Sequence, residues 1–567
     1  MFQHSMVSIL IFILAMLLAL PTGAYMSKLY KGERTLLDFL SLFENFLYKI
    51  CGINQSAGMN AKQYFLALVV INLIWLVFGF IILLAQGSLF LNPAGNPSMG
   101  WSLALNSVIS FLTSTNLQHY SGETGATYLS QVVVFMFLQF VSAATGLSVA
   151  VALVRGLAAK SHKALGNFYT DFVRSITRIL LPLCIITAVL FLFRGVPSTF
   201  NGPDHITTLQ GDSSTIATGP VAAFLPIKEL GSNGGGFFGA NDAHPFENPD
   251  FFSFILHAVI IFLLPMAFVF FAGHYLHAKR FAAMIFGVMT LGFVLFTIPI
   301  IKEEVKGNPA ITQMGIHAGG NMEGKEARYG TFYSAFYCGE NVCIPAGTPV
   351  GFHDSFMPIS GAFMLLGMNV DAFFGGAGTG WINMFIFLVI ALFIGSLMIG
   401  RTPELFGKKI GIKEIQIIVG VNVLQSLIPI VLAAIACFVY IRFSGGNDSL
   451  QWLTNKGAHG FTTFLYEYIS SVAGNGSGFE SLGDNTVFWN LTTSIAMLTG
   501  RFIPIAGALW IAGLLQDKVY TPACAGTLKM QGFTFGLFLF CIIIIINVLS
   551  LFPPLMLGPV NESLLLK

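Results

Sequence analysis

Long uncharged apolar runs alternate with short polar segments along the whole chain. A helix needs about 20 apolar residues to cross a bilayer, so these runs predict ten membrane-spanning helices. The sequence is therefore predicted to fold as an all-α polytopic membrane protein. The expected spans cover residues 3–22, 64–86, 128–153, 178–195, 252–273, 281–301, 381–400, 415–441, 486–512 and 531–556.

Glycine- and asparagine-rich stretches interrupt this pattern at 113–122, 231–240, 374–380 and 473–478. Non-helical backbone is tolerated at membrane depth only where protein buries it or where it lines a wet cavity, because hydrocarbon cannot satisfy its N–H and C=O groups. A semi-apolar stretch of short-helix length precedes each interruption. These stretches are 101–112, 219–230, 354–367 and 459–472.

The alternation predicts four fused copies of one unit: a span, a short pore helix, a filter loop and a second span, arranged around a pseudo-fourfold axis. The third and fourth copies support this interpretation, because Gly376-x-Gly378 and Gly476-x-Gly478 lie 100 residues apart and each is followed after the same interval by Gly-Arg, at 400–401 and 500–501. The expected repeats are 64–160, 161–280, 281–414 with an outer loop at 302–353, and 415–516. Residues 1–63 and 517–567 then add one helix at each end, the first with a cytoplasmic loop.

Basic residues gather in alternate loops, which predicts the orientation. By the positive-inside rule these loops are cytoplasmic, so both termini and all four interrupted loops are expected outside. The basic positions are Lys28, Lys31 and Arg34 after the first span, Arg155 after the third, Lys279 and Arg280 after the fifth, Arg401, Lys408 and Lys409 after the seventh, and Lys518 and Lys529 after the ninth.

Composition agrees with a membrane protein. Charged residues make up 10% of the chain and hydrophobic residues 55%, whereas soluble domains carry about a quarter charged residues. The net charge of +2 comes without any basic block that would indicate nucleic-acid binding. Cys338 and Cys343 share one polar loop, where either a disulfide or two free thiols can be expected.

The interrupted loops have the composition that an alkali cation requires. A dehydrated cation needs several oxygens, and rings of main-chain carbonyls supply them. Glycine permits the positive φ that turns successive carbonyls toward one axis. Gly234–Gly236, Gly375–Gly378 and Gly474–Gly476 fit this demand, and Thr115-Asn116 offers the same backbone with bracing side chains. The alternative is that these glycines only permit tight turns or close helix packing.

Acidic residues flank every interruption. On the outer side they would concentrate cations at the mouth of a pore. They would equally serve as helix caps, with Asp484 and Asn485 opening the ninth span. The residues are Glu123, Asp242, Glu247, Asp371, Glu480 and Asp484.

These motifs resemble the potassium-translocating A subunit of the Kdp P-type ATPase of bacteria. Gly231–Pro249 looks like that family's second filter loop almost throughout. Ser114–Gln118 looks like the first loop, Phe374–Gly380 the third and Gly474–Phe479 the fourth. Arg401–Glu404 also matches, so the resemblance extends over essentially the whole chain.

The resemblance implies a K⁺-binding and K⁺-translocating subunit of an ATP-driven uptake complex in the bacterial cytoplasmic (inner) membrane. K⁺ would enter a filter from outside and pass to a KdpB-like P-type ATPase partner, with KdpC-like and KdpF-like small subunits completing the complex. Neither Asp-Lys-Thr-Gly nor Gly-x-x-x-x-Gly-Lys-[Ser/Thr] occurs in the chain. The chain is therefore not expected to bind ATP or to be the ATP-hydrolysing subunit.

The resemblance also suggests site residues. Gln118 is expected to contribute its side chain to selectivity, and His119 beside it departs from the family pattern. Arg501 is expected to form an electrostatic barrier beneath the filter, unless it only snorkels from a helix end. The expected ion ligands are Thr115, Asn116, Asn233, Gly234, Gly235, Gly376, Gly378, Gly474, Asn475 and Gly476.

Two other classes of protein compete with this interpretation. An ion-coupled K⁺ symporter would share a fourfold filter and work without an ATPase. An intramembrane enzyme would use Asp242, His244 or Glu247 as acid or base, but neither a paired nucleophile nor a metal-ligand pattern accompanies them.

Overall fold

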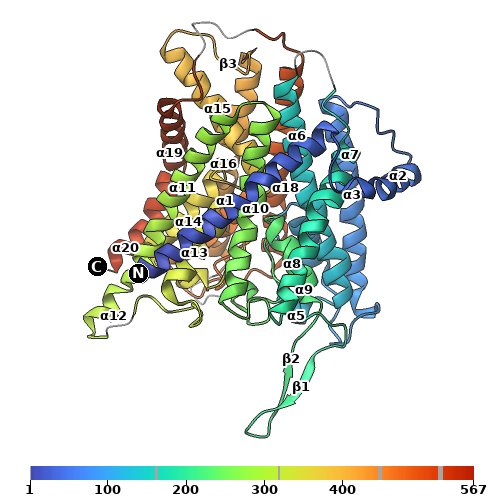
Figure 1. The fold of residues 1–567 in the computed structure, drawn as a ribbon. Coiled ribbons are helices and arrows are strands. Elements are labelled where there is room, and N and C mark those ends of the chain that lie inside the picture. Colours follow the sequence, from blue (N-terminus) through green and yellow to red (C-terminus); the bar gives the residue numbers. More distant parts are fainter. Residues whose placement is uncertain (1, 160–163, 317–318, 445–449, 522–527, 567) are drawn as a thin grey trace.

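The computed structural model describes residues 2–159, 164–316, 319–444, 450–521 and 528–566. Helices dominate, and the described strands form two small antiparallel pairs. β1 (Asp204–Thr207) pairs with β2 (Ser213–Ile216), and β3 (Glu404–Leu405) pairs with β4 (Lys408–Lys409). The long helices lie side by side, and both termini lie toward the end of the bundle that carries the β1–β2 hairpin, away from β3 (Figure 1).

Ten helices in the described residues are long and apolar enough to cross a membrane. Each of them overlaps one predicted span, so the prediction of a ten-span, all-α polytopic protein is confirmed. The spans are α1 (Phe2–Lys31), α3 (Ala61–Ala85), α6 (Phe137–Ala158) with a π-helical start at Ser130–Met136, α7 (Phe168–Ser175) running through Ile176–Leu180 into α8 (Leu181–Phe193), α10 (Phe251–Tyr275), α11 (Lys279–Lys306), α15 (Thr379–Met398), α16 (Ile412–Phe443), α18 (Val487–Gln516) and α19 (Phe533–Leu555).

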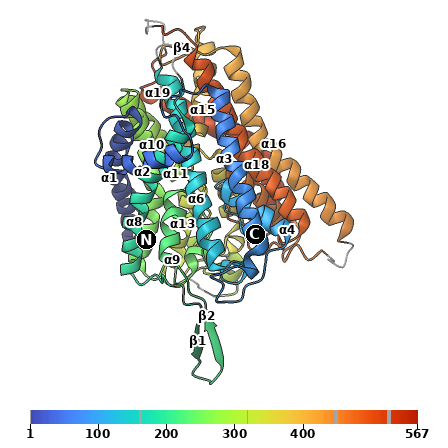
Figure 2. The ribbon, with the colours of Figure 1, turned by 90° about the vertical axis from the view of Figure 1, so that its right-hand side faces the viewer.

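The spans differ in what surrounds them. α6 and α10 are buried over most of their length, whereas α3 and α16 expose many large apolar side chains. In the view of Figure 2, α16 lies at the edge of the bundle. Exposed leucine, isoleucine and phenylalanine on these helices form the surface that meets lipid, because hydrocarbon solvates them without cost.

Four shorter helices lie between the spans along the chain: α4 (Trp101–Leu112), α9 (Val221–Leu230), α13 (Gly330–Cys343) and α17 (Ala458–Ala473). Three of them match predicted pore helices. The predicted third one forms as α14 (Pro358–Val370), whereas α13 lies inside the stretch expected to be an outer loop. Cys338 and Cys343 are free, buried thiols on α13, so the disulfide considered above does not form.

α14 and α15 are separated by a break at residues 371–378. Asp371, at the end of α14, has a left-handed backbone with φ 38°. Phe373 packs where a side chain on Gly292 of α11 would lie, and Gly378 packs against the main chain of Gly146 in α6. Because Gly292 and Gly146 lie near the middle of their spans, the break lies at the middle depth of the bundle.

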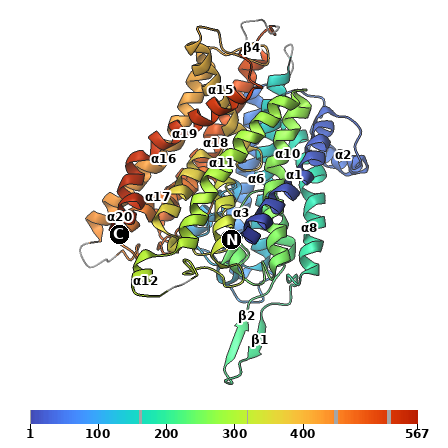
Figure 3. The ribbon, with the colours of Figure 1, turned by 60° about the vertical axis from the view of Figure 1, so that its left-hand side comes forward.

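The remaining helices are short. Figure 3 shows α12 at the end of the bundle that carries the hairpin. The short elements are the 3₁₀ turns Asp38–Leu40, Gln86–Ser88, Asn241–Ala243 and His353–Ser355, the helices α2 (Ser41–Ile50), α5 (Gly122–Gly125), α12 (Pro309–Gln313) and α20 (Asn561–Leu565), and the π-helical turn Met556–Val560.

Candidate ion-binding site

The loops that follow α4, α9, α13 and α17 meet in a closed ring. We call them the first loop (113–118), second loop (231–236), third loop (344–349) and fourth loop (474–478). A Cβ on Gly235 would lie 3.0 Å from Asn116 O, which places the second loop against the first. A Cβ would overlap Ala346 O if added to Gly234, Asn475 O if added to Gly347, and Thr115 O if added to Gly476. The first loop therefore contacts the second, the second contacts the third, the third contacts the fourth, and the fourth contacts the first again.

One hydrogen bond recurs in all four loops and makes their residues equivalent. A main-chain N–H donates to the carbonyl five residues earlier, at the end of the preceding short helix. The bonds are Thr115 to Ser110 (3.0 Å), Asn233 to Lys228 (2.9 Å), Ala346 to Asn341 (3.4 Å) and Asn475 to Ser470 (2.9 Å). Thr115, Asn233, Ala346 and Asn475 are thus the four corresponding positions of one ring.

Backbone conformation around these positions follows the same rule. In the first, second and fourth loops, the residues on either side of the corresponding position have positive φ. They are Ser114 (63°) and Asn116 (55°), Ser232 (44°) and Gly234 (74°), and Gly474 (71°) and Gly476 (92°). Because φ changes sign at each step, successive peptide planes rotate and present their oxygens to one side.

The third loop keeps only half of this pattern. Gly347 has φ 53°, but Pro345 holds the place where the other loops have positive φ. The pyrrolidine ring fixes φ near −65°. The third quarter of the ring therefore differs in backbone shape from the other three.

Open main-chain oxygens line the ring. Among the loop and turn bonds of the residues that the structure describes, no main-chain N–H donates to the carbonyl oxygen of Thr115, Ala346 or Asn475. Buried carbonyls without a partner are costly, because burial removes the water that would otherwise solvate them. A dehydrated cation would satisfy several of them at once, so the ring has the chemistry of a cation site.

Side chains hold the second loop from behind. Asn116 Nδ2 and Gln139 Nε2 donate to Gly234 O at 2.7 Å and 3.1 Å. Gln118 accepts from Gly236 N–H at 2.9 Å through Oε1 and donates to Gly236 O at 3.0 Å through Nε2. The side-chain amides of Asn116 and Gln118 thus already bond to main-chain groups of the second loop, so these residues hold that loop in position.

Eight of the predicted ligands lie in the ring, and two do not. Gly376 and Gly378 belong to the break between α14 and α15, where Ala377 N–H donates to Ser232 Oγ at 2.5 Å. The structure therefore disagrees with the prediction that 374–380 is the third filter loop, and the 100-residue offset to the fourth repeat does not reflect equivalent positions. Ala346 and Gly347 take this place instead. The eight residues found together are Thr115, Asn116, Asn233, Gly234, Gly235, Gly474, Asn475 and Gly476.

A buried charge network lies behind the second loop. Lys228 Nζ contacts Asp242 Oδ1 and Glu247 Oε2, each at 2.6 Å, and all three side chains are inaccessible to solvent. Glu247 Oε1 also accepts from Phe238 N–H at 2.8 Å. Asp242 and Glu247 are therefore structural ion-pair partners, which argues against both their exposure at the mouth and an acid–base role in an enzyme.

An acidic vestibule of about 770 Å³ lies next to the ring. Asp484 lines it, and the residue that caps α18 is Thr486, so the capping role considered for Asp484 is wrong. Burial raises the pKa of Glu480 to about 7, although N–H groups of His353 and Asp354 oppose this shift. The other acidic and polar lining residues include Gln118, His119 and Glu326.

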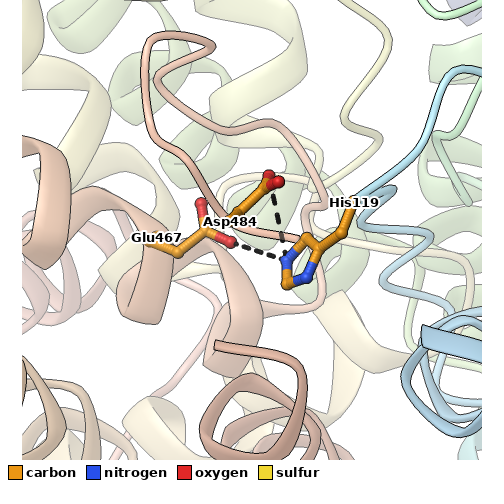
Figure 4. A group of neighbouring side chains, drawn as sticks. All are labelled: His119, Glu467 and Asp484. Carbon is orange, nitrogen blue, oxygen red and sulfur yellow. Dashed lines mark hydrogen bonds and ion pairs between the residues drawn. The ribbon is translucent and has the colours of Figure 1, made fainter. Parts of the chain in front are cut away.

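His119 lies next to Gln118 on the vestibule wall. Its Nδ1 lies 2.7 Å from Asn490 Oδ1, and its Nε2 lies 3.3 Å from Glu467 Oε1 (Figure 4). Burial disfavours the imidazolium form, but the carboxylates of Asp484 and Glu467 outweigh burial and raise the pKa of His119 to about 9.

A much smaller cavity, of about 20 Å³, lies next to the ring and has Thr115, Asp371 and Arg501 in its wall. This is room for roughly one water molecule. Arg501 lies midway along α18 and donates from Nη2 to Ser142 O at 2.9 Å. Arg501 is therefore not a residue snorkelling from a helix end.

Comparisons with known proteins agree with the resemblance of the filter motifs. The family described as "Potassium-transporting ATPase A subunit" matches residues 9–564. A "potassium-transporting ATPase potassium-binding subunit" of Flavobacterium johnsoniae is 50% identical over 566 residues, 98% of each chain. One of the same name from Bacteroides thetaiotaomicron is 44% identical over 553 residues, 97% of each chain.

A solved structure shares the architecture. The crystal structure of the potassium transporter TrkH from Vibrio parahaemolyticus matches with a TM-score of 0.51, covering 90% of this chain and 98% of that one. At 17% sequence identity this likeness concerns the fold alone.

Proposed function

The chain belongs to the family of potassium-transporting ATPase A subunits, and from this premise we propose that its ring of main-chain oxygens is the K⁺-selectivity filter of an ATP-driven uptake complex. One observation carries the proposal: the same N–H to carbonyl bond fixes Thr115, Asn233, Ala346 and Asn475 in corresponding places. Residues at corresponding positions in four loops around a pseudo-fourfold axis would direct their main-chain oxygens toward that axis. Neutral carbonyls hold a monovalent cation without the strong grip of a carboxylate.

The proposed ligands are the main-chain oxygens of Thr115, Asn233, Ala346 and Asn475, together with those of Asn116, Gly347 and Gly476, which follow in the first, third and fourth loops. In the second loop, Gly234 O already accepts two side-chain hydrogen bonds. Asn116, Gln118 and Gln139 set the position of the second loop through their amides. Gly376 and Gly378 are not proposed as ligands.

We further propose that K⁺ leaves the ring sideways. The small cavity with Arg501 in its wall shares Asp371, Gln425, Val472 and Ala473 with a second cavity, of about 10 Å³, that is also lined by Met368 and Asn369 of α14. Arg501 would repel a cation that continued straight toward the cytoplasm. A lateral path between α14, α16 and α17 fits transfer to a partner subunit.

The partner would supply the energy. The chain carries no nucleotide-binding or phosphorylation motif, so a KdpB-like P-type ATPase subunit is proposed to hydrolyse ATP and release K⁺ inside. KdpC-like and KdpF-like subunits would complete the complex. The proposed location is the bacterial cytoplasmic membrane, with both termini and the acidic vestibule outside, because the basic loops lie at the opposite end.

A symporter that works without an ATPase is the other candidate. Only the fold likeness favours it, whereas the family match and the relatives that cover nearly the whole chain favour the ATPase subunit.

Crystals or cryo-microscopy grids of the purified complex in Rb⁺ or Tl⁺ test the filter directly, since both ions substitute for K⁺ and scatter strongly. We expect density between Thr115, Asn233, Ala346 and Asn475. Ion density beside Gly376 and Gly378, with none inside the ring, would overturn the assignment. Uptake by the purified chain alone, without ATP, would favour the symporter.

A further inference from the structure

His119, Glu467 and Asp484 form a compact group that the filter does not use. They come from three segments: the residue directly after the first loop, the short helix α17 and the residues just before α18 (Figure 4). His119 and Glu467 are buried, whereas the Asp484 side chain is 28% exposed. His119 and Asp484 both line the acidic vestibule, so an ion from solution can reach this group.

The imidazole of His119 is held in one orientation. Asn490 Oδ1 lies 2.7 Å from Nδ1, and Asn490 Nδ2 donates to Ser102 Oγ at 3.2 Å, which fixes the direction of the amide. Nδ1 therefore carries the proton that it donates to Asn490. In the neutral imidazole, Nε2 then directs its lone pair at two carboxylates. Such an arrangement needs a positive charge at Nε2, either a proton or a metal ion.

The distances from Nε2 to the carboxylates distinguish a proton from a metal ion at this position. Charge-assisted N–H···O bonds are about 2.7–2.9 Å long. Nε2 lies 3.3 Å from Glu467 Oε1 and 4.0 Å from Asp484 Oδ2, so neither contact has the length of a strong imidazolium–carboxylate bond. Ligands about 2.0 Å from a tetrahedral ion lie roughly 3.3 Å apart. One ligand atom from each residue falls within 4.8 Å of the others, so a small closure completes tetrahedral spacing.

We propose that His119 Nε2, Glu467 and Asp484 bind a divalent transition-metal ion of the Zn²⁺ class at the outer mouth, with water from the vestibule as the fourth ligand. Asn490 already orients the metal-binding tautomer, because its Oδ1 accepts the proton on His119 Nδ1. A nitrogen ligand selects against K⁺, Mg²⁺ and Ca²⁺, which prefer oxygen alone.

The other group with metal-ligand spacing does not compete with this site. Glu229, Asp242 and His257 also bring their ligand atoms together, but Lys228 Nζ already lies 2.6 Å from Asp242 Oδ1 and 3.5 Å from Glu229 Oε1. An ammonium group therefore supplies the positive charge there.

Occupancy of the proposed metal site would reduce K⁺ entry, a consequence that rests on the proposed function. His119 directly follows Gln118, which holds the second loop. A bound dication cancels the charge of Glu467 and Asp484 and lowers the local concentration of K⁺ at the mouth. The half-saturating K⁺ concentration of the complex should rise.

Zinc binding to the whole purified complex tests the site, with Co²⁺ as a spectroscopic probe of nitrogen coordination. The variants are Asp484→Asn, which keeps the shape of a partly exposed side chain, and His119→Gln. His205→Ala, on the exposed β1–β2 hairpin, is the matched control. We expect one equivalent of Zn²⁺ in the parent and control, and affinity lower by at least about ten-fold in both site variants. Unfolding midpoints without metal verify that each variant is folded.

Equal Zn²⁺ affinity in all four proteins, or no binding to the parent, would overturn the site and leave an imidazolium–carboxylate pair. ATP hydrolysis as a function of K⁺ concentration tests the consequence. Zinc should raise the half-saturating K⁺ concentration of the parent and of His205→Ala but not of Asp484→Asn. Binding without this shift would overturn the inhibitory role alone. Neither result bears on ion density in the ring, so failure here is separate from failure of the proposed filter.

Discussion

Gly234 lies so close to Ala346 that a Cβ at residue 234 would overlap the main-chain oxygen of residue 346, and it would lie 3.0 Å from Asn475 O. The missing side chain of Gly234 is thus what keeps the second, third and fourth loops at the spacing of the ring. Gly234 also has φ 74°, which an L side chain rarely adopts.

Replacing Gly234 with Ser should therefore weaken ion discrimination. We expect the preference for K⁺ over Na⁺ to fall by about ten-fold or more, equivalent to roughly 1.4 kcal/mol, because the carbonyls are re-aimed. The measurement is K⁺- and Na⁺-stimulated ATP hydrolysis by the reconstituted complex. Gly287→Ala is the control, since a Cβ there meets open space. Unchanged ion preference in Gly234→Ser would remove this residue from the filter.

The third loop is tested by a pair of glycines. Gly347→Ala should reduce apparent K⁺ affinity strongly, because its Cβ would overlap Asn475 O and its φ is 53°. Gly376→Ala should have the smaller effect, because its Cβ would meet two side-chain hydroxyls, of Thr379 at 2.6 Å and of Ser232 at 3.6 Å, and no main-chain atom. The reverse order in a K⁺ titration would restore 374–380 as the third filter loop.

Gln118 acts through two hydrogen bonds to Gly236. A typical intramolecular hydrogen bond contributes about 1 kcal/mol, so Gln118→Ala should raise the half-saturating K⁺ concentration by roughly ten-fold or more. Gln118→Glu keeps the acceptor for Gly236 N–H and should therefore raise the half-saturating K⁺ concentration by less than Gln118→Ala does. An unaltered concentration dependence in both variants would contradict the bracing role.

Arg501 is expected to affect coupling and not selectivity. Arg501→Gln removes the positive charge from the cavity next to the ring, so K⁺ should leak through without a matching amount of ATP hydrolysis. The check is the ratio of K⁺ flux to ATP hydrolysis in proteoliposomes, together with the K⁺ to Rb⁺ preference. A constant ratio, or a changed ion preference, would speak against a barrier.

His459 links α17 to α20 and supplies a pH prediction. Its ring nitrogens lie 2.8 Å from Asp354 Oδ1 and 2.8 Å from Glu562 Oε1. Burial lowers the pKa of His459, but these carboxylates outweigh burial and raise it to about 10. A pKa above that of the unfolded chain, about 6.5, means that the stabilisation is complete below that pH and is lost as pH rises through 10.

The thermal unfolding midpoint of the complex should thus fall more between pH 7 and pH 10 for the parent than for His459→Gln. Other groups titrate in this range, so the difference between the two proteins is the informative quantity. Identical pH profiles would show that His459 carries no linked stability.

Much of this fold follows from hydrophobicity alone, because a lipid-facing helix must be apolar over its full length. The span at Lys279–Lys306 was predictable for that reason. α13 was not, since Glu340 and Asn341 reduce its hydropathy although both are buried inside the protein. Residues 374–380 were predicted to be the third filter loop because they are rich in glycine. The loop that takes this place has a single glycine, Gly347, and has Pro345 where the other loops have a residue of positive φ. The hydrogen bond from Ala346 N–H to Asn341 O shows that residues 344–349 correspond to the other three loops. Amino-acid composition cannot predict such a bond.

Lys228 also constrains how this protein is made. An ammonium group cannot enter hydrocarbon alone without a large penalty, yet Lys228 is inaccessible to solvent in the finished molecule. Its counter-charges, Asp242 and Glu247, follow within the same short stretch of chain. The second quarter of the pore can therefore pair its charges during membrane insertion, before the third and fourth quarters have been synthesised.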